Sequence, residues 1–193
     1  IAVGVKSGGG DDQKNTAETS TAQEETSETA AAKADASTRA TATALGIGGG
    51  AGDDAIVNIA PVSVKAASTV GAGSIAVGVG MGAEGNVSAE ATTGAAGIRG
   101  GDGNDSIRNE GTMNVEAKSI VGAGSIAVGV SGSGKEESAD AKADASGKAK
   151  TAAVGISGGS GSDSLVNIGP LNVKASSTVG AGSIGVSVGG DVE

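Results

Sequence analysis

The residues of this chain that are best suited to chemistry are aspartates at a fixed place in three glycine-rich segments. These segments read GGAGDDAIV at 49–57, GGDGNDSIR at 100–108 and GGSGSDSLV at 158–166. Their glycines allow a tight turn whose carbonyl oxygens point inward, and the sixth residue of each segment adds a carboxylate. Ca²⁺ takes about six to eight oxygen ligands of these kinds. The spacing therefore indicates a calcium site, and the alternative is an aspartate that stabilises its own turn through hydrogen bonds to backbone N–H groups.

The composition excludes most other chemistry. Cys, His, Trp, Tyr and Phe are all absent from the 193 residues. Without thiolates or imidazoles the chain has no nucleophile or soft-metal ligand of those kinds, and without aromatic rings it has no stacking surface for bases. The 22 acidic residues outnumber the 13 basic ones, which opposes binding to nucleic acid and attracts cations. We expect that the chain is not an enzyme, binds no nucleic acid and contains no membrane span.

The elements that must position these aspartates belong to a repeat. Blocks at 45–79, 96–130 and 154–188 match one another without a gap over thirty residues and then end in IAVGV or IGVSV. Units that recur along a chain usually bury their apolar faces against the neighbouring copies, as in a solenoid. We therefore expect 1–193 to be a single repeat array and a fragment of a longer chain.

Spacers of variable length separate these blocks. They span 6–44, 80–95 and 131–153 and contain 39, 16 and 23 residues. Because their length varies while the blocks keep their register, we expect each spacer to stand outside the stacked core as an arm. Residues 17–36 of the longest arm are rich in Ala and Glu, so the alternative there is a short helix.

Alternation within the spacers predicts strands. Alanines at every second position, such as Ala139, Ala141 and Ala143, are separated by polar residues, which is typical of a strand with one packed face and one solvent-facing face. In the segment that leaves each block, Ile75 and Val77 share one face, and the small residues of the other face allow a second sheet to approach closely. The expected fold class is all-β, a parallel β-solenoid-like repeat array with variable-length protruding β arms.

The aspartate-bearing segments match G-G-x-G-x-D-x-U-x, where U is a large apolar residue, and so resemble the nonapeptides of haemolysin-type calcium-binding (RTX) repeats. RTX nonapeptides stand in tandem, so that stacked neighbours complete each site, whereas the aspartates here are 51 and 58 residues apart. Sites can therefore form only if one repeat makes one rung of the stack. The resemblance implies Ca²⁺ ligands from the carboxylates of Asp54, Asp105 and Asp163 and from the carbonyls of Gly50, Gly52, Gly101, Gly103, Gly159 and Gly161.

Two further columns are expected from residues that recur at one place in every block. An asparagine stands four residues after each aspartate, at Asn58, Asn109 and Asn167, and identical amides in stacked rungs form hydrogen-bonded ladders. An apolar residue two positions after each aspartate should form a second, internal column. Its members are Ile56, Ile107 and Leu165.

The D-x-I-x-N-x-G texture of the blocks also resembles the large secreted repeat exoproteins of bacteria, the filamentous-haemagglutinin-like adhesins and autotransporter passengers. These resemblances imply an extracellular or cell-surface bacterial protein that serves as a structural fibre, biofilm matrix or adhesin stalk stiffened by calcium. The alternatives are an adhesin whose arm tips bind a ligand and, more remotely, an ice-binding array. Both ends are strands that match copies of themselves inside the array, so we expect head-to-tail self-association into fibres.

Overall fold

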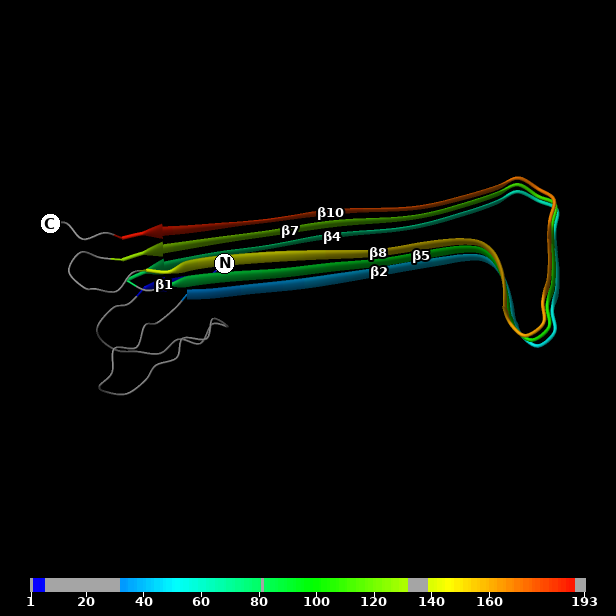
Figure 1. The fold of residues 1–193 in the computed structure, drawn as a ribbon, viewed down its shortest axis with the longest axis horizontal. Coiled ribbons are helices and arrows are strands. Elements are labelled where there is room, and N and C mark those ends of the chain that lie inside the picture. Colours follow the sequence, from blue (N-terminus) through cyan, green and yellow to red (C-terminus); the bar gives the residue numbers. More distant parts are fainter. Residues whose placement is uncertain (1, 6–31, 81, 132–138, 190–193) are drawn as a thin grey trace.

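Three long, flat rungs lie on top of one another in the computed structural model, which describes residues 2–5, 32–80, 82–131 and 139–189 (Figure 1). In each rung a long outward strand leads to a bend, a four-residue strand crosses the bend, and a long return strand runs back beside the first. The outward strands are β2 (Ala32–Ala51), β5 (Ala83–Asp102) and β8 (Ala141–Ser160); the crossing strands are β3 (Ala55–Asn58), β6 (Ser106–Asn109) and β9 (Ser164–Asn167); the return strands are β4 (Val62–Val79), β7 (Met113–Val130) and β10 (Leu171–Val188).

Equivalent strands of successive rungs form three parallel sheets. The strand orders are β1-β4-β7-β10, β2-β5-β8 and β3-β6-β9, where β1 (Ala2–Val5) pairs with the last residues of β4. Ile107 of the middle rung is paired with Ile56 on one side and Leu165 on the other, as the block alignment predicts. One repeat therefore makes one rung, and the all-β parallel architecture is confirmed. In the part of the chain that is described, no helix is long and apolar enough to cross a membrane.

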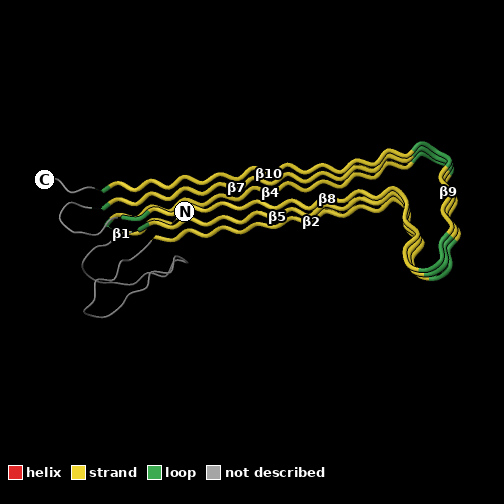
Figure 2. The backbone as a smooth tube through the Cα atoms, viewed as in Figure 1, coloured by secondary structure: helices red, strands yellow, loops and turns green. Residues whose placement is uncertain are grey.

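The spacers contribute more to the stack than the sequence predicts. Their last 13 residues (32–44, 83–95 and 141–153) form the beginnings of β2, β5 and β8 and pair residue by residue, as in the column of Ala32, Ala83 and Ala141. The expectation that a whole spacer stands outside the stacked core is therefore wrong for residues 32–44 and their equivalents. Figure 2 shows that the loops of the described chain gather at the bend and at the opposite ends of the rungs. Residues 6–31, which include most of the possible helix, and 132–138 lie outside the described residues.

Small side chains fill much of the core between the two long layers, beside larger ones such as Ile98 and Val121. Ala91, Ala117 and Ala127 of the middle rung are completely buried. In β4 the inward face carries Ala76, which is 0% exposed, whereas Ile75 points outward and is 39% exposed. At this end of the strand the face without bulk is thus the packed one, because small residues let the outward and return layers approach closely.

Two columns of hydroxyl groups divide this core. In one, Ser119 donates to Thr93 Oγ1 at 2.8 Å and accepts from the Thr151 hydroxyl at 2.8 Å. In the other, the Ser125 hydroxyl donates to the Gly85 carbonyl oxygen at 2.6 Å. Since these buried hydroxyls have partners, they join the two layers without the cost of an unsatisfied polar group.

Candidate cation site in the stacked glycine turns

The three glycine-rich turns lie directly above one another at the bend, between the outward and the crossing strands. Gly101 pairs with Gly50 below it and Gly159 above it. Its φ of +127° is in the left-handed region, and a Cβ at this position would collide with the carbonyl oxygen of Gly50. The turn therefore requires glycine for two reasons. All six glycines that the RTX resemblance implies have such a φ, between +107° and +131°: Gly50, Gly52, Gly101, Gly103, Gly159 and Gly161.

In each pair of neighbouring rungs, one carboxylate oxygen of the aspartate in the later rung links the two turns. The backbone N–H of Asp54 donates to Oδ1 of Asp105 at 2.9 Å, and the N–H of Asp105 donates to Oδ1 of Asp163 at 2.9 Å. The stack thus brings the three predicted carboxylates into one column. Each bond links successive turns, whereas the alternative derived from the sequence has an aspartate that stabilises its own turn.

The other oxygen has no such role. Oδ2 of Asp54 and Oδ2 of Asp105 are buried and lack a hydrogen-bond partner, and Asp105 as a whole is only 2% exposed. A Cβ built on Gly49 would lie 2.6 Å from Asp54 Oδ2 and 2.6 Å from the carbonyl oxygen of Gly100. The same corner recurs one rung higher, where Asp105 Oδ2 and the Gly158 carbonyl oxygen both face Gly100. Each free carboxylate oxygen therefore shares a corner with a carbonyl oxygen of the next rung.

The oxygen atoms at this corner are of the kinds that bind a hard cation. They are carboxylate and carbonyl oxygens, which Ca²⁺ prefers, and no described lysine or arginine forms an ion pair with any of the three aspartates. Within the described ranges no three acidic side chains converge on one point, so backbone oxygens would have to supply much of the coordination. Two backbone oxygens that share a corner with these carboxylates belong to Gly100 and Gly158, the first glycines of their segments, which the sequence reasoning missed.

A second ladder at the same turns also escaped the sequence reasoning. The N–H of Asn104 donates to Oδ1 of Asp53 at 2.7 Å, and the N–H of Ser162 donates to Oδ1 of Asn104 at 2.9 Å. In these bonds the later rung donates to the earlier one, whereas in the aspartate ladder, one residue further along each turn, the earlier rung donates to the later one. The sequence does contain a sign of this ladder. The fifth residue of each glycine-rich segment is Asp, Asn or Ser, and all three residue types accept hydrogen bonds from backbone N–H groups.

The predicted asparagine ladder is confirmed. Asn58 donates from Nδ2 to Oδ1 of Asn109 at 2.7 Å, and Asn109 donates to Oδ1 of Asn167 at 2.7 Å. The same Nδ2 of Asn109 donates to the Gly111 carbonyl oxygen at 2.9 Å, and its side chain is fully buried. This column holds the crossing strands in register.

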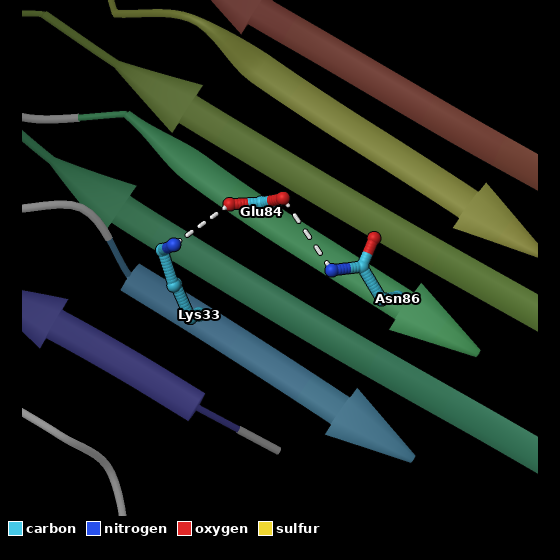
Figure 3. Close-up of polar contacts among 3 residues, drawn as sticks. All are labelled: Lys33, Glu84 and Asn86. Atoms are coloured by element: carbon cyan, nitrogen blue, oxygen red, sulfur yellow. Dashed lines mark hydrogen bonds and ion pairs between the residues drawn. The ribbon is translucent and has the colours of Figure 1, made fainter. Parts of the chain in front are cut away.

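Charged side chains form a further polar cluster on the outer face of the outward strands (Figure 3). Lys33 lies 3.2 Å from a carboxylate oxygen of Glu84, and Asn86 donates to the other oxygen at 3.4 Å. The hydrogen bond from Lys33, helped by Asn86 and by the nearby positive charges of Lys33 and Lys142, lowers the pKa of Glu84. The exposed face of the stack is therefore organised by charge as well as by backbone register.

Comparisons of the chain with protein-family models, with curated proteins and with solved structures find no match. The site is accordingly interpreted from its own geometry.

Proposed function

We propose that this chain is a segment of an extracellular bacterial fibre, a matrix or adhesin stalk, that grows by the stacking of rungs. The observation that carries this proposal is the open face of the last rung of the described stack. Val121 in the middle rung is 2% exposed, whereas its equivalent Val179 in the last rung is 47% exposed. Ile107 and Leu165 differ in the same way, at 1% and 45%. A further rung would bury these side chains and pair the free strand edges.

The first rung supports continuation in the other direction. The backbone of β1 pairs with Ala76–Val79 in the same parallel register that β7 uses on the opposite side of β4. β1 therefore takes the place of the last four residues of a further return strand. Head-to-tail contacts that do not close on themselves give filaments.

Calcium along the aspartate column is the second part of the proposal. Three carboxylates in successive rungs, about 4.8 Å apart along the stack, repel one another when charged. Asp105 Oδ2 is buried without a partner, so a bound cation would remove a cost that the fold otherwise carries. Asp54, Asp105 and Asp163, with the neighbouring glycine carbonyls, are the residues that would hold it. Bound Ca²⁺ would supply charge neutralisation and crosslinks between rungs.

The alternatives receive less support. An ice-binding array needs regular ranks of threonine, but Thr41 and Thr92 share their column with Lys150, and Thr43 shares its column with Gly94. A ligand-binding adhesin would use the arm tips, and the longest of these lies outside the described residues.

The fibre proposal is tested with the purified full chain in about 1 M salt, where the Debye length is about 3 Å and charges on the surface are screened. We expect electron microscopy to reveal filaments, and fibre diffraction to give the axial repeat of about 4.8 Å that parallel rungs produce. Compact single chains under all conditions would contradict the fibre. The calcium proposal is tested separately, since filaments whose melting does not respond to a calcium chelator would contradict it. Mg²⁺ serves as the control cation.

A further inference from the structure

Charges on the outer faces alternate in sign from rung to rung. In three columns the first and third rungs carry a cation and the middle rung carries a glutamate, and two of these columns lie on the outward strands while one lies on the return strands. The columns are Lys33–Glu84–Lys142, Arg39–Glu90–Lys148 and Lys65–Glu116–Lys174.

The middle glutamates pair with the first rung. The ion-pair distances are 3.2 Å from Lys33 to Glu84, 2.7 Å from Arg39 to Glu90 and 3.8 Å from Lys65 to Glu116. On the other side of the glutamates, the third-rung lysines form no ion pair with any described residue, although they follow the same register. Their exposed ammonium groups mark the open end formed by β8, β9 and β10.

A fourth column obeys the same rule with the opposite sign. Asp35 and Asp144 flank Asn86, so an uncharged amide separates two carboxylates. Together with the serines of the next column these residues line a shallow groove of about 350 Å³ on the outer face. In none of these four columns do two like charges stand in adjacent rungs.

This pattern determines which rung can follow. If the last rung stacked in register on the first rung of another copy, Lys142 would face Lys33 and Lys148 would face Arg39. Lys174 would likewise meet another lysine, and Asp144 another aspartate. Like charges directly opposite one another in a sheet are destabilising. In addition, β1 already occupies the edge of β4 at Ala76–Val79, where β10 of that other copy would have to pair.

We propose that the β8–β10 end docks a rung with the charge pattern of the middle rung, with carboxylates opposite Lys142, Lys148 and Lys174 and an uncharged side chain opposite Asp144. The inference rests on the proposed fibre and identifies its next rung. The fibre then has a two-rung charge repeat within its one-rung backbone repeat. Copies of this chain stack directly on one another only when salt screens the like charges and β1 leaves the edge of β4.

The test extends the full chain at its C-terminus by a second copy of residues 80–131, which is a rung of the middle type. A matched extension carries Glu84→Lys, Glu90→Lys and Glu116→Lys in the added copy only. A control extension carries Lys118→Glu in the added copy, because the neighbours of Lys118 in its column are the uncharged Ala67 and Ser176. Hydrogen exchange of the backbone amides in β8 and β10 measures whether the added rung docks.

At low salt we expect the unmodified and the control extensions to slow exchange of the amides in β8 and β10 by at least about tenfold. The lysine extension should leave their exchange rates close to those of the unextended chain, because three cross-strand pairs change from attractive to repulsive. The difference should shrink in about 1 M salt. Equal protection by the unmodified and lysine extensions, or protection by neither, would overturn the inference. The added rung docks within one chain, so this result does not depend on filament formation. Whether the unextended chain forms filaments tests the fibre proposal separately.

Discussion

The backbone N–H of Asp54 donates a hydrogen bond to Oδ1 of Asp105, 51 residues further along the chain, at 2.9 Å. That bond gives the two oxygens of the Asp105 carboxylate different roles. Oδ1 holds successive turns together, while Oδ2 is buried and has no hydrogen-bond partner. A substitution that keeps the acceptor and removes the charge can therefore separate the structural role from cation binding.

Asp105→Asn is that substitution. Without calcium we expect the variant to be at least as stable as the unmodified protein, because it retains Oδ1 and loses a buried charge without a partner. With free calcium at about a hundred times its dissociation constant, the unmodified protein should gain about 2.7 kcal/mol and the variant much less. Thermal unfolding with calcium and with chelator measures both. Asp102→Asn is the control, since Asp102 is exposed and accepts its hydrogen bond from the Ser160 hydroxyl. An equal calcium response in both variants would exclude Asp105 as a ligand.

Asn109→Ala should cost about 2–3 kcal/mol in the free energy of unfolding. It removes two hydrogen bonds donated by Asn109 and leaves the Nδ2 group of the buried Asn58 without one of its acceptors. Urea unfolding measures the loss. Asn114→Ala is the matched control on an exposed position of β7, and its effect should stay within about 0.5 kcal/mol. Similar losses for the two variants would mean that the ladder contributes little.

Gly101→Ala and Gly124→Ala test why the turns need glycine. Gly101 has a left-handed φ and no room for a Cβ, whereas Gly124 in β7 has no atom within 4 Å of the Cβ position. We expect a cost of at least about 2 kcal/mol at Gly101 from backbone strain and steric overlap. At Gly124 the change should be neutral or stabilising by about 0.5 kcal/mol, because alanine restricts the unfolded chain. Thermal unfolding of the two variants side by side provides the comparison.

Glu84 should contribute to the acid sensitivity of the fold. Its pKa lies below the ordinary value of 4.5 because Lys33 and Asn86 donate hydrogen bonds to the charged carboxylate. A lowered pKa in the folded state gives stability that is present above pH 4.5 and is lost as the pH falls through the lowered value. The stability difference between the unmodified protein and Glu84→Gln should therefore be largest above that pH and diminish below it. In Lys33→Gln the pKa of Glu84, followed by NMR, should move back towards 4.5; an unchanged value would contradict the role of Lys33.

Most of the architecture could be predicted from the sequence because it depends on register. The ungapped blocks fix the pairing of Asn58 with Asn109 and of Ile56 with Ile107 once one repeat makes one rung. The extent of the stack could not be predicted, because the unequal lengths of the spacers conceal that their final parts, from Ala32 and Ala83 onward, are equal in length. Ala76 rather than Ile75 faces the core because the two layers lie close together there. The alternation of residue types in the sequence does not reveal that distance. The free oxygen of Asp105 is likewise a matter of three-dimensional geometry, since the motif does not say which oxygen the ladder uses.

The direction of the hydrogen bonds has a mechanical consequence. All strands run across the stack, so the bonds between rungs point along its axis (Figure 1). The middle rung presents strands of 20, 4 and 18 residues to each neighbour. Tension along the axis loads all of these bonds together, whereas a force on one arm tip breaks them one after another. The stack therefore resists being pulled end to end and fails first by peeling from its tips.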